Sequence, residues 1–189
     1  WQGKIPVSAD TLVGAYFPWL DYKSGFPNGV PVKNALISDI FSQFYLWKYL
    51  DVRLMASGIW PLWNIYSFSG TPLLGNYASS PFLPFNLLLF LPKNYGWAFY
   101  ILGETLTAAL GMYLFLGIYT KDNLARIAGS LIFSLSGLMT TWLEFGTGVY
   151  AAAMLPFIFY SAAQFIDLKK WRYLFLFSIA FMTLYLAGH

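Results

Sequence analysis

Charged side chains are scarce in this chain of 189 residues, because Asp, Glu, Lys and Arg together make up only 10% of it. Soluble globular domains typically carry about 25% charged residues. Cysteine is absent altogether, which excludes disulfides and thiolate metal sites and leaves the redox compartment undetermined. Only one histidine is present, so a His-rich metal site within this chain is excluded as well.

The sequence motifs of soluble enzymes are also missing. The chain contains no GxSxG nucleophile turn, no P-loop, no dinucleotide-binding fingerprint and no HExxH zinc motif. The formal net charge of +3 is small and spread along the chain. Because no basic run is interleaved with aromatic residues, nucleic acid is not expected as a partner.

Apolar residues are abundant, with 58% of the chain hydrophobic and 21% aromatic. So much apolar surface with so little charge predicts that the lipid bilayer is the solvent. The chain starts at Trp1 instead of Met and stops at His189 directly after an apolar segment. We therefore expect a piece of a longer membrane protein that lacks at least one helix before Trp1.

Residues 1–96 are expected to form a long aromatic loop, because proline and glycine interrupt its apolar runs. Within it, residues 38–57 predict an amphipathic helix that lies at the membrane surface and is too polar to span it. Ser38 or Asp39 is expected to cap that helix, and Gly58 to end it. Residues 82–92 are apolar but short, which favours an interfacial or re-entrant segment.

The remaining chain, 97–189, predicts transmembrane helices at about 97–120, 124–143, 149–166 and 173–188. Small residues recur at helical spacing, as in Ala125–Gly129, and are typical of close helix packing in lipid. Basic residues occupy the turns 120–126 and 167–172, which the positive-inside rule places in the cytoplasm. Loop 1–96, the turn 144–148 and His189 are then expected to share the outer side.

Asp39 is the most interesting carboxylate of the loop. Gln43 and Trp47 follow it at one and two helical turns, so the three residues share one face. A carboxylate near apolar surface can act as a base, whereas aspartate at a helix start is commonly an N-cap. Sequence reasoning leaves both roles open.

Three further polar residues and a group of aromatic residues complete the candidates. Glu104 lies near the centre of a predicted span, where a charge usually faces protein or a polar cavity. Glu144 and His189 are expected at outer helix ends, and histidine is a natural proton carrier. The aromatic residues of the loop have two possible roles. They predict either a belt at the lipid headgroups or a binding surface for a sugar ring or an isoprenoid chain. The residues are Trp19, Trp47, Trp60, Trp63 and Tyr66.

Several short segments occur in the order found in one membrane-protein family, namely SDIFSQFYLWK at 38–48, PLWN at 61–64, FSGTPLL at 68–74, PFLPFN at 81–86, LGMYLFL at 110–116, SLSG at 134–137 and LAGH at 186–189. Together they resemble the YfhO-like bacterial membrane proteins of the GT-C superfamily of polytopic glycosyltransferases. The resemblance implies an all-α fold with surface helices in its first outer loop, in the bacterial cytoplasmic membrane. It also implies an essential loop aspartate, matched best by Asp39 and second by Asp10.

The activity that the resemblance implies is transfer of a sugar from a polyprenyl-phosphate donor to an outer glycan or envelope polymer, by inverting single displacement. Lys48, Arg53 or a divalent cation would stabilise the leaving phosphate. The loop lacks the adjacent acidic pair common in the superfamily, which leaves the metal requirement undetermined. The other residues expected to contact substrate are Gln43, Trp47, Trp63, Asn64, Glu144 and His189.

Two other functions remain open at this point. A transporter or flippase of a lipid-linked saccharide would use Glu104 as a charge in a membrane cavity. A non-catalytic membrane scaffold would use the aromatic loop to bind a partner. Neither is excluded by the residues alone.

Overall fold

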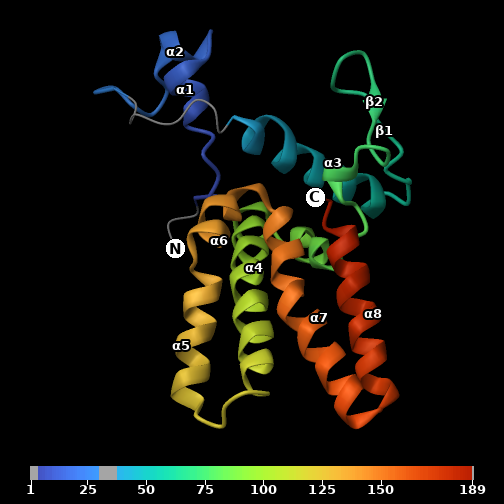
Figure 1. The fold of residues 1–189 in the computed structure, drawn as a ribbon. Coiled ribbons are helices and arrows are strands. Elements are labelled where there is room, and N and C mark those ends of the chain that lie inside the picture. The colour runs from blue at the N-terminus through green and yellow to red at the C-terminus, as the bar shows by residue number, and fades with distance from the viewer. Residues whose placement is uncertain (1–3, 30–37, 189) are drawn as a thin grey trace.

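The computed structural model describes residues 4–29 and 38–188 (Figure 1). The described elements, in chain order, are α1 (Thr11–Ala15), α2 (Trp19–Tyr22), the π-helical turn η2 (Ile40–Phe44), α3 (Tyr45–Ala56), β1 (Trp63–Asn64), β2 (Thr71–Pro72), the 3-10 helices η3 (Tyr77–Ser79) and η4 (Pro84–Phe90), α4 (Lys93–Leu116), α5 (Asn123–Ser134), α6 (Gly137–Trp142), the 3-10 helix η5 (Leu143–Phe145), α7 (Gly148–Leu168) and α8 (Trp171–Leu186). The two short strands pair antiparallel. The described chain is therefore mostly helical, as the composition predicted.

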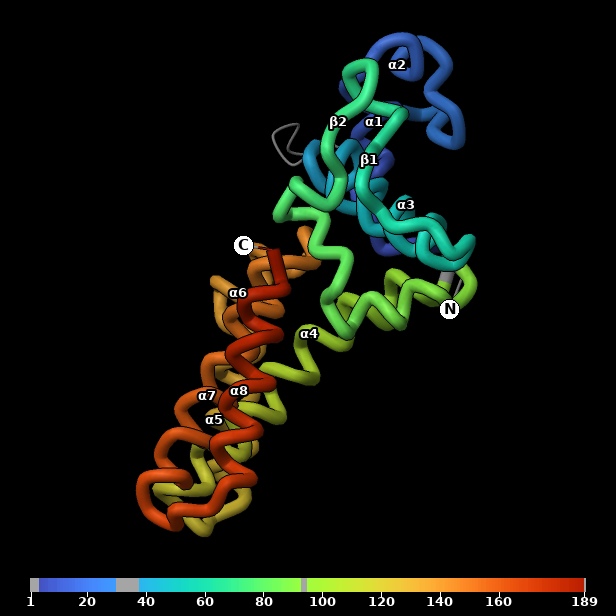
Figure 2. The backbone as a smooth tube through the Cα atoms, turned by 90° about the vertical axis from the view of Figure 1, so that its right-hand side faces the viewer, coloured from blue at the N-terminus to red at the C-terminus, as the bar shows by residue number. Residues whose placement is uncertain are grey.

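Four helices, α4, α5, α7 and α8, run side by side as a bundle (Figures 1 and 2). Two of them contain stretches long and apolar enough to cross a bilayer, Tyr95–Leu116 in α4 and Gly148–Leu168 in α7. These two helices match the predicted spans 97–120 and 149–166. They support the conclusion that the protein associates with a membrane.

The predicted span 124–143 is not one continuous helix. It is broken into α5 and α6, which meet at 44°, because Ser136 adopts an extended conformation with ψ of 159°. Serine and glycine around the break are weak helix formers that compete with helical hydrogen bonding. Counted as one bent span, the pair would be a third crossing.

The predicted span 173–188 corresponds to α8, which is apolar but has only 16 residues. At about 1.5 Å per residue it is roughly 24 Å long, shorter than a hydrocarbon core of about 30 Å. It packs along the length of α7 (Figure 1).

The two ends of the bundle differ in the way that the turn analysis predicted. The α4–α5 and α7–α8 turns, which contain the basic residues, lie together at one end (Figure 1). Helix α6, η5 and the end of α8 lie at the opposite end, beneath the loop region. The basic turns and the loop region therefore lie at opposite ends of the bundle.

The loop region is ordered around α3, which lies across one end of the bundle (Figures 1 and 2). The α1–α2 pair and the β1–β2 hairpin extend from α3 on its side away from the bundle. Tyr16, just after α1, makes an edge-on ring contact with Phe41 at 6.3 Å between centroids. The segment 82–92 contains the short helix η4 and leads into α4 without crossing the bundle.

The predicted amphipathic helix at 38–57 is present as η2 and α3, but the polar residues are not all on its outer face. Lys48 and Asp51 have no exposed surface, whereas Leu46 is 54% exposed. The tertiary contacts therefore turn two charged side chains of α3 toward the bundle.

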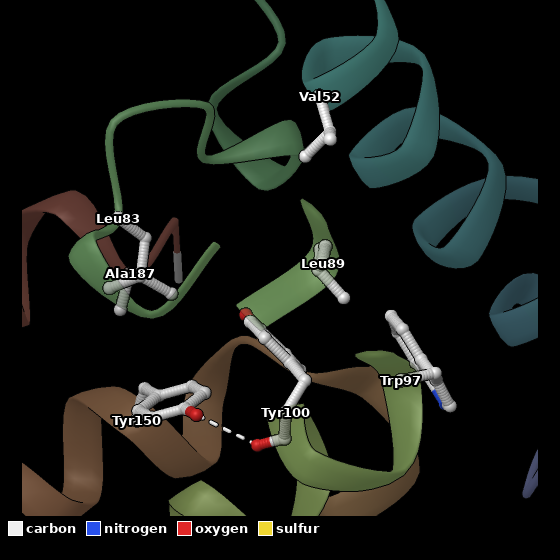
Figure 3. Packing of buried hydrophobic residues seen from close by; sticks show 7 residues of the cluster. All are labelled: Val52, Leu83, Leu89, Trp97, Tyr100, Tyr150 and Ala187. Atoms are coloured by element: carbon white, nitrogen blue, oxygen red, sulfur yellow. Dashed lines mark hydrogen bonds between the residues drawn. The ribbon is translucent and has the colours of Figure 1, made fainter. Parts of the chain in front are cut away.

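One hydrophobic cluster joins the loop region to the bundle. Its buried residues come from α3, η4, α4, α7 and the segments beside η4 and α8, and are Val52, Leu83, Leu89, Trp97, Tyr100, Tyr150 and Ala187 (Figure 3). The Tyr150 hydroxyl donates a hydrogen bond to the Tyr100 carbonyl oxygen at 2.7 Å. Because they share this cluster, the loop region and the adjacent end of the bundle pack as one unit.

Candidate functional site

A groove of about 570 Å³ lies between α3, the β1–β2 hairpin and the end of η4. The volume is within the range of known small-molecule and cofactor sites, about 300–1,000 Å³. Trp47 and Arg53 line the groove from α3, Tyr66 lines it from the hairpin, and Phe90 lines it from η4. The groove thus collects aromatic side chains from three segments that are distant in the sequence.

The groove combines one positively charged side chain with apolar walls. Among its described lining residues only Arg53 is charged, and this side chain is exposed. Leu46 and Leu50 lie one turn apart on the same side of α3 and supply apolar surface. A guanidinium group binds phosphate through two parallel hydrogen bonds, and the apolar walls can contact hydrocarbon.

Asn64 shapes the hairpin wall of the groove. It is buried, its Nδ2 donates to Ser67 Oγ at 3.1 Å, and its Oδ1 accepts from the Tyr66 backbone N–H at 2.9 Å. These bonds form a local turn that places Tyr66 and Ser67 in the groove lining. Trp63 is not among the lining residues, since its indole ring packs against Gly70.

Asp39 stands at the start of η2 and is exposed. The predicted capping role is wrong for its side chain, which makes no cap hydrogen bond. Instead, Gln43 Nε2 donates to Asp39 Oδ1 at 2.8 Å. The predicted pairing of these two residues on one helical face is confirmed, and one carboxylate oxygen stays without that bond.

Glu144 belongs to η5, which packs against the end of η2. It is exposed within η5, and the next residue, Phe145, meets Phe44 edge-on at 5.5 Å between ring centroids. His189 is outside the described residues. Gly188, which precedes it, packs against the η3 turn, where an added Cβ atom would lie 2.9 Å from Ser80 Cβ.

The remaining loop candidates are further from the groove lining. Asp10 occupies the N-cap position of α1, without a side-chain cap bond. Trp19 is half exposed in α2, and Trp60 contacts Phe82 at 5.8 Å between ring centroids. The structure thus brings Trp47, Arg53, Asn64 and Tyr66 together and leaves Asp10, Trp19 and Trp63 outside this set.

Lys48 does not face the groove, in contrast to its predicted phosphate-binding role. It is fully buried, its Nζ donates to Ser80 Oγ at 2.5 Å, and Nζ lies 5.2 Å from the centroid of the Tyr100 ring. Lys48 directly follows Trp47 in α3. Because successive residues of a helix point in different directions, Trp47 lies on the groove face and Lys48 lies on the buried face.

Two carboxyl groups are buried near Lys48, Asp51 of α3 and Glu104 of α4. None of their four oxygen atoms accepts a hydrogen bond from the residues that the structure describes. Burial raises the pKa of Asp51 to about 8, against the opposing effect of Lys48. Burial lowers the pKa of Lys48 to about 8, against the effects of Glu104 and Asp51.

Sequence reasoning named Glu104 and Lys48 but missed Asp51 as their neighbour. The available signal was the spacing of Lys48 and Asp51, three residues apart on one helical face. Within residues 4–29 and 38–188, no three His, Asp or Glu side chains gather in a way that would hold a metal ion.

Comparison of the chain with protein-family models, with curated proteins and with solved structures finds no match.

Proposed function

We propose that this chain belongs to a membrane glycosyltransferase that uses a polyprenyl-phosphate sugar. The observation that supports this best is the groove beside α3, where Arg53 lies among aromatic and aliphatic side chains at the end of an apolar bundle. A lipid-linked sugar phosphate needs the same combination of a cation, ring-stacking surfaces and apolar walls.

In this proposal Asp39 is the general base. The acceptor hydroxyl oxygen attacks the anomeric carbon, its proton passes to the Asp39 carboxylate, and the bond between the anomeric carbon and the phosphate oxygen breaks. The polyprenyl phosphate leaves with the electron pair, and Arg53 stabilises its charge. Gln43 holds the carboxylate through the bond at 2.8 Å.

The proximity of Asp39 to a groove-lining residue supports this assignment, although Asp39 itself is not among the lining residues. Ser42, one turn further along the same helix, lines the groove. Asp10 is the second candidate base. Glu144, beside η2, would lie on the acceptor side of the same region.

The test is a transfer assay with the purified full-length protein and a polyprenyl-phosphate sugar. We expect Asp39→Asn to lose at least about 100-fold in turnover, since general-base catalysis contributes typically 10²–10⁴-fold. The matched control is Asp21→Asn, an exposed loop aspartate in α2, which should keep its activity. Normal turnover by Asp39→Asn would remove Asp39 as the base, and loss on Asp10→Asn alone would transfer the role to Asp10.

Wild-type protein that turns over no polyprenyl-phosphate sugar would remove the proposed activity as a whole and favour the scaffold hypothesis. The transporter hypothesis relied on Glu104 in a polar cavity, but Glu104 is fully buried beside Lys48. If Glu104→Gln abolished saccharide flux across vesicles while transfer was never detected, the transporter hypothesis would replace ours.

A further inference from the structure

Three ionisable side chains are fully buried where α3 meets the bundle, Lys48 and Asp51 from α3 and Glu104 from α4. We call them the buried triad. The other titratable groups that face it are Tyr100 of α4, under the Lys48 ammonium, and Tyr150 of α7. Ser79 and Ser80 of the η3 turn provide the nearby hydroxyl groups.

The charge balance of the triad depends on one proton. With all three groups ionised, the buried site has a net charge of −1, and with both carboxyl groups protonated it has a net charge of +1. An uncompensated buried charge is strongly unfavourable. The neutral arrangement has the Lys48 ammonium, one carboxylate and one protonated carboxyl group.

Ser79 lies beside Asp51, and a bond from its hydroxyl group favours the ionised carboxylate and so lowers the pKa of Asp51. The Ser79 hydroxyl group also donates to the Leu73 carbonyl oxygen at 2.9 Å. Burial outweighs the effects of Ser79 and Lys48 and favours the protonated form of Asp51, with a pKa of about 8.

We propose that Lys48, Asp51 and Glu104 share one proton and hold α3 against the bundle, so that the triad positions the groove face of the same helix. Lys48 is the positioning residue of this device, since it donates to Ser80 of the η3 turn and lies within electrostatic reach of Glu104 on a bundle helix. Trp47 precedes it and Arg53 follows within two turns, and both line the groove. The proposal concerns helix docking and can be tested without any transfer activity.

The first test compares the thermal unfolding of four variants of the full-length protein in detergent. Asp51→Asn and Glu104→Gln should each keep a Tm close to wild type, because the remaining carboxylate balances Lys48. The Tm of the double variant Asp51→Asn/Glu104→Gln should fall by much more than the summed decreases of the two single variants, because the buried ammonium then has no counter-ion. Adding Lys48→Met should restore part of that loss.

Two outcomes would contradict the proposal that the triad shares one proton. One is a single Asp51→Asn or Glu104→Gln variant that is as unstable as the double variant. The other is a triple variant no more stable than the double variant, which would show that the residues act through shape alone.

The second test is the pH dependence of the same unfolding. Since the pKa of Asp51 is raised to about 8, the folded protein binds more protons than the unfolded chain below pH 8, and stability falls as pH rises toward 8. Since the pKa of Lys48 is lowered to about 8, stability rises again above pH 8. Asp51→Asn should reduce the fall below pH 8, since only Glu104 is then left to contribute to it, and should keep the rise above pH 8. An unchanged fall would contradict the proposal.

The third test measures the docking of α3 directly in this cysteine-free chain. Val52→Cys places a thiol on α3 at a position that is 6% exposed and part of the joining cluster. Its maleimide labelling should be slow in the wild-type background and several-fold faster in the double variant, because α3 separates from the bundle more often. Asp167→Cys is the control, because Asp167 is exposed in the last turn of α7, next to the basic α7–α8 turn. It should label at the same rate in the wild-type background and in the double variant. An unchanged Val52→Cys rate would refute the docking role.

Discussion

At the residue scale, Gly146 shows how one position controls the outer end of the bundle. Its φ of 66° lies in the left-handed region, and an added Cβ atom would lie 2.8 Å from Tyr100 Cε1. The same ring is held in place, because the Tyr100 hydroxyl donates to the Gly146 carbonyl oxygen at 2.6 Å. A side chain at this position therefore meets both a backbone and a packing penalty.

We expect Gly146→Ala to destabilise the protein by roughly 2–5 kcal/mol, from about 1–2 kcal/mol for a left-handed alanine and about 1–3 kcal/mol for overpacking. The control is Gly137→Ala, where an added Cβ atom meets no atom within 4 Å and helix propensity favours alanine by up to about 1 kcal/mol. Chemical unfolding in mixed micelles measures the free energy of unfolding of both variants. Equal effects at the two positions would show that the Tyr100 contact is unimportant.

At the element scale, the α4–α5 turn is held by Arg126. Its Nε and Nη2 both donate to the Tyr113 carbonyl oxygen, at 3.2 and 3.1 Å, and the guanidinium carbon lies 3.7 Å from the centroid of the Tyr113 ring. The helices also approach closely, since an added Cβ atom at Gly129 would collide with Leu116. The small residues noticed in the sequence therefore do serve helix packing.

We expect Arg126→Lys to destabilise the protein by about 1–3 kcal/mol, since the lysine ammonium cannot reproduce the planar two-bond contact and ring stacking. The positive charge is kept, so membrane orientation should not change. Lys121→Arg, at an exposed position of the same turn, is the matched control and should be neutral. A loss of stability for Lys121→Arg equal to that for Arg126→Lys would assign the effect to the turn in general.

At the scale of the whole molecule, the arrangement of the bundle predicts two sets of accessible positions. Ser57 directly follows α3 and Thr140 belongs to α6, and both are exposed. Asp167 is exposed in the last turn of α7, next to the basic α7–α8 turn. In Figure 1, α3 and α6 lie at the loop end of the bundle and the α7–α8 turn lies at the other end. Thr147 is fully buried and is unsuitable as a reporter. The absence of cysteine means that a single introduced thiol gives no background labelling.

We expect a maleimide that cannot cross the bilayer to label Ser57→Cys and Thr140→Cys on intact cells, and Asp167→Cys only after permeabilisation. The basis is the clustering of lysine and arginine in the turns at one end. The three variants keep every basic residue, so they leave the orienting charges unchanged. Labelling of Asp167→Cys with protection of Thr140→Cys would reverse the orientation and place the groove in the cytoplasm.

The sequence by itself determined the helical membrane character, the two long apolar helices, the helix after Asp39 and the grouping of turns at two ends. Hydropathy and helical periodicity are local properties, so single segments contain the necessary information. The broken span at Ser136 was not predicted, because the window of apolar residues runs through the break. Groove residues such as Trp47 and Asn64 were proposed from their chemistry alone.

Only the tertiary structure decided which face of α3 meets the bundle. It buried Lys48 and Asp51 against Glu104, although lysine and aspartate usually point to solvent. Lys48 and Glu104 are far apart in the sequence, and they interact only because the loop folds back over the loop end of α4. The free energy of a buried charge depends on all its partners together, and those partners come from segments that no local pattern connects.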